Sequence, residues 1–474
     1  MRFLFFLITY LELDMAIQTV NPFNNEVIKT FKEMTPQEIE KAVTKAHEAF
    51  KSWKKTPFST RSKVLHEAAA KMRSQKEELA QIITLEMGKL ISDARAEVDL
   101  SANILDYYAD NAEKFLKRQK VDVETGEAYV VFDPIGVVFG IEPWNFPFYQ
   151  VARIAAPNIM AGNTVLIKHA SNVPQCGIAL ERLFKEGGAP EGVYTNLLIS
   201  SKAVAQVIEN PKIAGVSLTG SEGAGAHVAE TAGKSLKKSV LELGGNDPFI
   251  VLDDANIEKT LDSAIWAKMN NTGQCCIAAK RYILMDSIAD EFIKKFSEKL
   301  AKLKPGDPSK DKTTLGPLSS EGAAVLLQKQ IDETIKKGAK ALVGGKRPDI
   351  KGAFVTPTVL VDVKPGMPAY SEELFGPVAT IFRVKTEEEA IHLANDTVFG
   401  LGASVFSDNL ERAEKVAKQI DSGMVFINHP TWTEPDLPFG GTKKSGYGRE
   451  LSEVGIFEFV NKKLIRISDY NDPF

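Results

Sequence analysis

Apolar runs alternate with amphipathic segments through the middle of the chain. From residue 136 onward this alternation predicts strands over 136–141, 164–168, 193–199, 213–218 and 239–243. The intervening segments have helical periodicity and are predicted as helices over 148–160, 174–185, 202–209 and 222–232. Strands that alternate with helices at this spacing indicate parallel βαβ units in a doubly wound sheet.

A second α/β set follows residue 242. Its predicted strands lie at 282–285, 378–384, 403–406 and 424–428. Helices are expected to open at Ser287 and, with a capping box, at Thr386. A further helix over 409–420 is expected to end at a C-cap formed by Gly423.

The N-terminal region and two further segments follow different patterns. Residues 36–117 have mostly amphipathic helical periodicity, and Thr35 with Glu38 forms a capping signal for the first helix. Segments 121–135 and 460–474 fit neither α/β set and are predicted to be extended.

Length and composition narrow the class of protein. A chain of 474 residues is too long for one core, and two or three domains are expected. A formal net charge of -4 argues against a nucleic-acid partner bound by bulk electrostatics. The three cysteines include an adjacent pair, which favours a reducing compartment over a disulfide framework. The six histidines lack metal-ligand spacing, so no metal site is predicted.

The first residues resemble a short signal peptide. An apolar run over 2–11 follows one positive charge, but Glu12 and Asp14 come next and no small-x-small cleavage site is present. The run is also too short to span a bilayer. We therefore expect residues 1–14 to be an upstream start-site artefact or a short extension, with secretion as the alternative. We predict a cytoplasmic protein without a membrane partner.

Three short motifs carry candidate chemistry. The run Asn-Thr-Gly-Gln-Cys-Cys, which ends at Cys276, offers a thiol after a tight turn. Upstream, Glu242 is followed by the pair Gly244 and Gly245, which let the backbone turn sharply. A thiol that attacks a carbonyl and a carboxylate that later activates water are the two halves of a covalent thioester mechanism. Asn145, in Pro-Trp-Asn-Phe-Pro, offers an amide donor for an oxyanion.

Together these motifs resemble the aldehyde dehydrogenase superfamily, and the likeness covers nearly the whole chain. The local sequences at 140–147 and 168–174 are similar to those of bacterial succinate-semialdehyde dehydrogenases. The resemblance implies two doubly wound, Rossmann-like domains and a small β arm. The cofactor-binding domain would comprise 1–120 and 136–241, the catalytic domain 242–440, and the oligomerisation arm 121–135 and 460–474. Pairing through that arm would give a homodimer or homotetramer.

The resemblance also implies a reaction sequence. The family pattern Gly-Gln-x-Cys assigns the nucleophile to Cys276, with Cys275 as its neighbour. Asn145 and the backbone N–H of Cys276 would hold the oxyanion, and hydride transfer to NAD(P) would leave a thioester. Glu242 would then act as general base for the water that hydrolyses the thioester, which favours a free acid as product.

The cofactor site is expected where the family places it, because the chain has no Gly-x-Gly-x-x-Gly after its first strand. By resemblance, a Thr-Gly-Ser-x-x-x-Gly turn and the motif Glu-x-Phe-Gly-Pro contribute, and the implied contacts are Trp144, Gly220, Ser221, Gly225, Glu373 and Phe375.

Two residues bear on the choice between NADP and NAD. In the family a lysine at the position of Lys168 lies against the adenosine ribose, and NAD-preferring members often have a glutamate where this chain has Ser171. A carboxylate there would repel a 2′-phosphate by several kcal/mol at about 4 Å and an effective dielectric near 20. We predict that NADP is used and preferred over NAD.

The substrate prediction depends mainly on Arg153. Succinate-semialdehyde dehydrogenases have arginine at this position, so the resemblance implies a grip on a substrate carboxylate, with help from Thr433. The alternative is a salt bridge to a nearby acidic group. Some relatives carry a second arginine where this chain has Asn270. The predicted function is oxidation of succinic semialdehyde to succinate, with glutarate semialdehyde, lactaldehyde or glyceraldehyde 3-phosphate as alternative substrates, and a crystallin-like role or an acyl-phosphate or coenzyme A enzyme as other classes.

Overall fold

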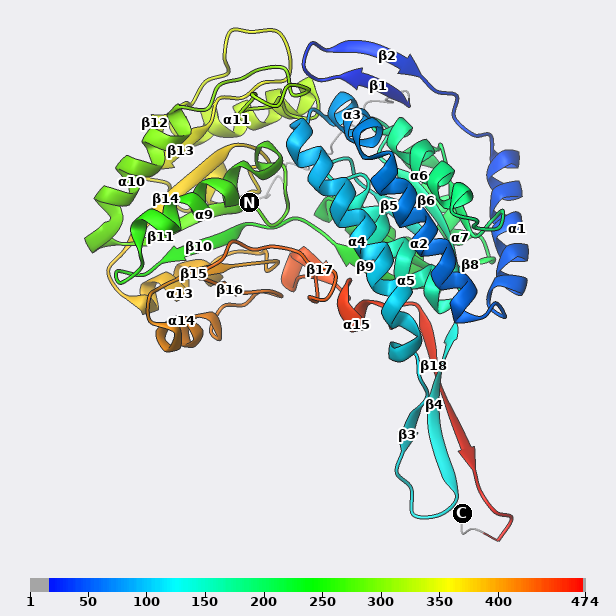
Figure 1. Cartoon of the computed structure of the whole chain (residues 1–474). Helices are drawn as coiled ribbons and strands as arrows, with labels where there is room; N and C mark the ends of the chain where they lie inside the picture. Colours follow the sequence, from blue (N-terminus) through cyan, green and yellow to red (C-terminus); the bar gives the residue numbers. More distant parts are fainter. Residues whose placement is uncertain (1–16, 472–474) are drawn as a thin grey trace, which may run out of the picture.

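Two mainly parallel sheets organise the chain, and a narrow three-stranded sheet projects from them as an arm (Figure 1). The computed structural model describes residues 17–471. The predicted start-site artefact at residues 1–14 lies outside this range. The alternation of strands and helices is present in both sheets, which confirms the predicted α/β fold class. Within residues 17–471, no helix is long and apolar enough to cross a membrane.

The first sheet has the strand order β17-β9-β8-β5-β6-β7. These strands are β5 (Val137–Glu142), β6 (Thr164–His169), β7 (Tyr194–Asn196), β8 (Ile213–Thr219), β9 (Lys238–Glu242) and β17 (Gly446–Tyr447). The helices that connect them are α5 (Tyr149–Ala161), α6 (Pro174–Glu186), α7 (Val204–Glu209) and α8 (Glu222–Lys234). Strand order reverses between β5 and β8, which makes the carboxyl ends of these strands the expected ligand-binding crevice.

Four helices from the N-terminal part of the chain pack around this first sheet. They are α1 (Pro36–Trp53), α2 (Phe58–Ser74), α3 (Lys76–Met87) and α4 (Ile91–Phe115). The capping box that opens α1 is formed as predicted, since Glu38 N donates to Thr35 Oγ1 at 3.3 Å and Thr35 N donates to Glu38 Oε2 at 2.7 Å. The hairpin of β1 (Gln18–Asn21) and β2 (Glu26–Thr30) precedes these helices and was not predicted.

The second sheet has the order β12-β13-β14-β11-β10-β15-β16. Its strands are β10 (Asp247–Val251), β11 (Ala279–Met285), β12 (Lys340–Val343), β13 (Thr358–Val361), β14 (Val378–Val384), β15 (Ser404–Phe406) and β16 (Phe426–Ile427). Its helices are α9 (Ile257–Met269), α10 (Asp286–Ala301), α11 (Glu321–Lys336), α12 (Pro368–Ser371), α13 (Glu387–Asn395), α14 (Leu410–Ala417) and α15 (Ser452–Gly455), the last of which lies beyond the sheet. Each sheet ends in one antiparallel edge strand, β12 here and β17 in the first sheet, which the parallel prediction did not include.

Two local predictions were wrong. The strand expected at 193–199 is only three residues long, as β7. Helix α14 ends at Ala417 with Lys418 as its C-cap, so Gly423 does not cap it. A Cβ on Gly423 would lie 1.8 Å from the carbonyl oxygen of Gly440, so this glycine is required by close backbone approach.

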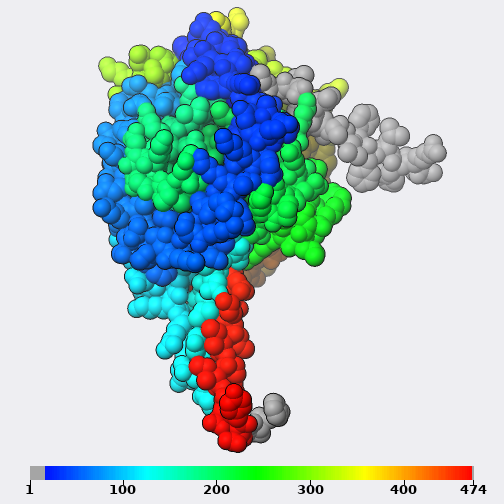
Figure 2. All heavy atoms as spheres, turned by 90° about the vertical axis from the view of Figure 1, so that its right-hand side faces the viewer, coloured from blue at the N-terminus to red at the C-terminus, as the bar shows by residue number. Residues whose placement is uncertain are grey.

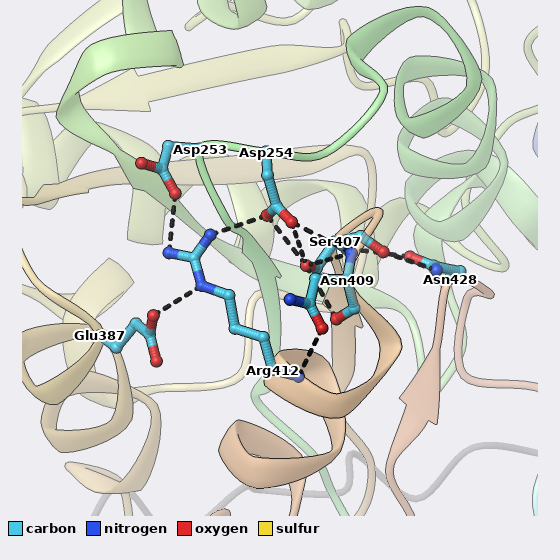
Figure 3. A network of polar contacts seen from close by, with 7 residues as sticks. All are labelled: Asp253, Asp254, Glu387, Ser407, Asn409, Arg412 and Asn428. Carbon is cyan, nitrogen blue, oxygen red and sulfur yellow. Dashed lines mark hydrogen bonds and ion pairs between the residues drawn. The ribbon is translucent and has the colours of Figure 1, made fainter.

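An ion-pair network lies just after the carboxyl ends of β10 and β15 in the second sheet (Figure 3). Arg412 Nη2 lies 2.7 Å from Asp253, Nη1 lies 2.9 Å from Asp254, and Nε lies 2.6 Å from Glu387. Ser407, which follows β15, also donates to Asp254. This network occupies the switch point between β10 and β15, where a ligand would bind in an ordinary α/β sheet.

The arm consists of β3 (Gln119–Val121), β4 (Glu127–Pro134) and β18 (Val460–Ile467). Strand β18 pairs antiparallel with β4 along its whole length, so two segments far apart in the sequence lie side by side. The arm extends well beyond the body of the molecule (Figure 2). Both segments that the sequence left unplaced therefore contribute strands to it.

Candidate active site

The loop before β11 carries both adjacent cysteines on an unusual backbone. Asn271, Thr272 and Gly273 have φ angles of 51°, 56° and 78°, in the left-handed region. Two non-glycine residues in succession there indicate a backbone held by its surroundings. A Cβ on Gly273 would lie 2.2 Å from the carbonyl oxygen of Gly376, so a side chain does not fit.

Amide side chains hold this loop in place. Asn271 Nδ2 donates to the carbonyl oxygen of Asn145 at 2.9 Å and to that of Gln274 at 3.2 Å. Gln274 Oε1 accepts from the backbone N–H of Ser319 at 2.8 Å. The first bond links the loop to the Pro-Trp-Asn-Phe-Pro segment after β5, and the bond to Ser319 links it to the segment before α11. The loop is therefore preorganised before any substrate binds.

The two thiols interact with each other. Cys275 is buried and Cys276 is half-buried. Their hydrogen bond lowers the pKa of Cys275 and, together with burial, raises the pKa of Cys276. The cations of Lys280 and Arg153 act in the opposite direction on Cys276. The first proton is therefore lost from the pair of thiols as a unit, and the pKa of either thiol depends on the state of the other. The nearby positive charges favour the thiolate form of Cys276.

Two hydrogen bonds fix the orientation of the Asn145 amide. Its Oδ1 accepts from Gln150 Nε2 at 3.1 Å, which fixes the amide so that Nδ2 faces the nucleophile loop. Nδ2 donates to the carbonyl oxygen of Gln274 at 3.1 Å. A carboxamide nitrogen has two N–H donors, so one remains for an oxyanion.

Glu242 ends β9 with a buried carboxyl group. Neither of its oxygens has a hydrogen-bond partner in the described structure. Burial raises the pKa of Glu242 well above its usual range, Arg153 opposes this, and Glu450 reinforces it. In its ionised form, a carboxyl group with a raised pKa and unpartnered oxygens is a stronger base toward water than an ordinary exposed carboxylate.

Glu242 belongs to a cluster at the carboxyl ends of three adjacent strands. Glu142 ends β5, Thr219 ends β8 and pairs across the sheet with Glu242. Burial also raises the pKa of Glu142 well above its usual range. Glu450 enters from the segment after β17, where it accepts from Ser217 at 3.2 Å.

Arg153 supplies the positive charge of this cluster. It is 1% exposed and forms an ion pair with Glu450, which is the alternative that the sequence left open. Its Nη1 donates to Tyr149 Oη at 3.2 Å and its Nη2 to Thr219 Oγ1 at 3.0 Å. Burial alone would lower the pKa of Arg153, but Glu450 and Tyr149 hold it above its ordinary value. Arg153 therefore stays charged.

Thr433 joins the same polar chain. Its Oγ1 lies 2.7 Å from the hydroxyl oxygen of Tyr149, which in turn accepts from Arg153. The structure thus connects Arg153 and Thr433 through Tyr149, a residue that sequence reasoning did not select. Its position four residues before Arg153, one turn earlier on α5, was the available signal.

The Gly-rich turn after β8 opens helix α8. Ser221 is the N-cap and accepts from the backbone N–H of Ala224 at 3.4 Å. A Cβ on Gly225 would lie 2.6 Å from Leu243 Cδ2, so this glycine permits close packing of the helix on the sheet. A helix N-terminus that leaves backbone N–H groups available suits a pyrophosphate.

Lys168 and Ser171 lie further along the same edge, at and after the end of β6. Lys168 is buried, and its Nζ donates to the carbonyl oxygen of His169 at 3.3 Å. Ser171 is half-buried and lines a small depression with Ile17 and residues 196–199. This depression is separate from the cysteine loop.

Glu373 and Phe375 connect the nicotinamide end of the predicted cofactor site to the nucleophile loop. The ring of Phe375 packs edge-to-face on Trp144 with centroids 5.7 Å apart. Glu373 accepts from the backbone N–H of Gly245 at 3.1 Å and pairs with Lys280 at 2.9 Å. Lys280 was not selected from the sequence, because it precedes the predicted strand 282–285 and stands beside a second cation, Arg281.

Comparison with known proteins defines the class. A sequence profile of the aldehyde dehydrogenase family matches residues 11–465. The chain belongs to the aldehyde dehydrogenase family.

Several similar relatives have the same description. The chain is 52% identical over 94% of both chains to a succinate-semialdehyde dehydrogenase [NADP(+)] of Deinococcus radiodurans. It is 45% identical to a probable enzyme of the same name from Synechocystis, over 96% of this chain and 100% of the relative. The crystal structure of succinic semialdehyde dehydrogenase from Streptococcus pyogenes in complex with NADP+ superposes with a TM-score of 0.94 at 44% identity, covering 95% of this chain and 100% of that one.

Proposed function

We propose that this protein oxidises succinic semialdehyde to succinate with NADP as the hydride acceptor. The observation that carries the proposal is one cluster in which Cys276 and Glu242 interact electrostatically with Arg153, Asn145 contacts the nucleophile loop, and Tyr149 joins Arg153 to Thr433. Relatives at 42% to 52% identity, which are described as NADP-dependent enzymes of this kind, support it.

In the proposed reaction the Cys276 thiolate attacks the aldehyde carbon and forms a thiohemiacetal. The free N–H of Asn145 and the backbone N–H of Cys276 stabilise the oxyanion. Bound NADP supplies a hydride acceptor. After the hydride has left, Cys276 carries a thioester, and Glu242 removes a proton from the water that hydrolyses it. The carboxyl oxygens of Glu242 have no hydrogen-bond partner in the described structure, which leaves them available for this last step.

The proposed cofactor site follows the carboxyl edge of the first sheet. Gly220, Ser221 and the N-terminus of α8 would hold the pyrophosphate, and Gly225 keeps that helix close to the sheet. Lys168 and Ser171 would face the adenosine ribose, where a cation and a hydroxyl suit a 2′-phosphate. We therefore propose NADP in preference to NAD, and a division into a cofactor-binding first domain and a catalytic second domain.

We propose that Arg153 holds the substrate carboxylate although it is paired with Glu450. A guanidinium has five N–H donors. The contacts with Glu450, Tyr149 and Thr219 use three of them, one on each nitrogen. One N–H on each terminal nitrogen is left for a carboxylate, and Thr433 lies beside Tyr149 to assist.

A double variant tests this role without leaving a buried charge unpaired. Arg153→Met alone would strand Glu450, which costs about 3–5 kcal/mol of stability. Arg153→Met combined with Glu450→Gln is neutral at both positions. We expect the double variant to lose the preference for succinic semialdehyde over its methyl ester by about 10- to 100-fold in kcat/KM, the value of a charge-assisted hydrogen bond. Glu450→Gln alone should keep the preference. An unchanged ratio in the double variant would limit Arg153 to a structural role.

We also propose that the arm mediates self-association. Leu464 and Ile467 on β18 are 61% and 51% exposed, and Val121 on β3 is 37% exposed. Exposed apolar side chains on an edge strand favour pairing with another chain. Sedimentation analysis of a Leu464→Lys and Ile467→Lys variant should show dissociation of a dimer or tetramer.

The three free cysteines support a reducing compartment, so we propose the cytoplasm as the location of this protein.

A further inference from the structure

Lys280 is a buried cation beside the nucleophile. It is the second residue of β11, and its side chain is 3% exposed. Every other residue of β11 is also buried. A lysine in such a strand needs partners for its ammonium group, because an isolated buried charge is strongly unfavourable.

All three partners of this ammonium group belong to the nucleophile loop or to the proposed cofactor site. Nζ donates to the carbonyl oxygen of Cys275 at 3.0 Å and to that of Cys276 at 2.7 Å. It also lies 2.9 Å from Glu373 Oε1. An ammonium group has three N–H donors, so these contacts satisfy it completely.

We propose that Lys280 is a positioning residue for the nucleophile: its ammonium group clamps the carbonyls of Cys275 and Cys276 and ties them to Glu373. The inference deepens the proposed function and rests on it for the role of Cys276. The clamp fixes the C-terminal side of a loop whose other side is held by Asn271 and Gln274. Both ends of the two-cysteine segment are therefore anchored to different elements.

The clamp also connects the nucleophile loop to the segment after Glu242. Glu373 accepts from the backbone N–H of Gly245, and a Cβ on Gly244 would lie 2.6 Å from Glu373 Oε2. Glu373 therefore packs against the two glycines that follow the proposed base. Through Lys280, the positions of thiol and base depend on the same carboxylate.

Charge is the second consequence of the clamp. Burial alone would lower the pKa of Lys280, but Glu373 and Asp247 keep it above its ordinary value, so the group remains an ammonium ion. Its charge opposes the rise in the pKa of Cys276 that Cys275 and burial produce. Removal of the charge should make the Cys276 thiolate less accessible at neutral pH.

Alkylation of the thiol by iodoacetamide tests the clamp without requiring aldehyde turnover. Peptide fragmentation by mass spectrometry measures modification of Cys276 separately from Cys275 over a range of pH. We expect Lys280→Met to slow alkylation of Cys276 by about tenfold or more at pH ~7.5 and to shift its pH profile upward. Lys280→Arg keeps the charge and should recover most of the rate.

Two further variants separate positioning from general stability. Lys268 is also a fully buried lysine in the second domain and donates to the carbonyl oxygen of Val378 at 3.0 Å. Lys268→Met should lower the melting temperature yet leave the alkylation rate within about twofold, since Lys268 contacts neither cysteine carbonyl. Lys280→Met with Glu373→Gln removes the stranded carboxylate and should still react slowly.

The outcomes are distinct from those of the proposed function. Alkylation of Cys276 at the wild-type rate and with the wild-type pH profile, in Lys280→Met or in the double variant, would overturn the clamp. Failure of the wild-type protein to oxidise succinic semialdehyde would overturn the proposed substrate and leave the alkylation result intact. If Lys280→Met does not fold, the double variant and Lys280→Arg decide the question.

Discussion

Replacement of Glu242 by glutamine should stop the reaction at the thioester. The two residues have nearly the same shape, and the carboxyl oxygens of Glu242 have no hydrogen-bond partner to lose. The substitution also removes one of the buried acids that share the charge of Arg153, so the fold should tolerate it. The change therefore removes basicity with little structural cost.

The size of the effect follows from the role of the group. Loss of a positioned general base typically slows a step by about 10²- to 10⁴-fold. Attack by Cys276 and hydride transfer do not need Glu242 in this role, so they should remain fast. Stopped-flow absorbance at 340 nm should therefore show a burst of about one NADPH per active site, followed by slow steady turnover.

The pH dependence gives a second signature. Because burial raises the pKa of Glu242, the wild-type rate of hydrolysis should fall as the pH drops through that raised value. Glu242→Gln should lack this acid limb. Hydroxylamine, which attacks thioesters without a base, should restore turnover in the variant. Wild-type steady-state turnover of Glu242→Gln, or the absence of a burst, would refute the assignment of Glu242 as the base.

The remaining predictions concern the oxyanion donor Asn145, the cofactor contact Ser171 and the packing of helix α8 at Gly225. Asn145→Ala should lower kcat by about 10²- to 10³-fold with a small change in the KM for NADP, measured by steady-state kinetics. Ser171→Glu should lower kcat/KM with NADP by about tenfold or more, because a carboxylate near a 2′-phosphate is repelled, whereas kcat/KM with NAD should change little. Gly225→Val should lower the melting temperature, since its Cβ would press on Leu243, with a cost of about 1–3 kcal/mol; an unchanged melting curve would contradict that packing.

Much of the fold follows from local patterns. The strands expected at 164–168 and 378–384 and the helix after Pro174 are present almost as predicted, because buried parallel strands and their connecting helices have strong periodicity. Gly423 shows the limit of such reasoning. A glycine after a helix is typical of a C-cap, but here the neighbouring backbone of Gly440 requires it, and that contact is invisible in the local sequence.

Candidate site residues could be predicted where they lie in a short sequence motif. They could not be predicted where only tertiary packing brings them together. Cys276, Glu242 and Asn145 each lie in a short motif. The ion pair of Arg153 with Glu450 joins residues far apart in the chain, and only the folded structure brings them together. Lys280 is close to Cys276 in sequence, yet its three contacts depend on how the strand β11 faces Glu373.

The most direct test of the proposed function is a parallel measurement of initial rates at 340 nm. Succinic semialdehyde and its methyl ester would each be assayed with NADP and with NAD. We predict the highest kcat/KM for the free acid with NADP, because Arg153 would hold its carboxylate and no carboxylate stands at Ser171 to repel the 2′-phosphate. Equal or faster oxidation of the methyl ester would contradict the substrate assignment, and a preference for NAD would contradict the cofactor assignment.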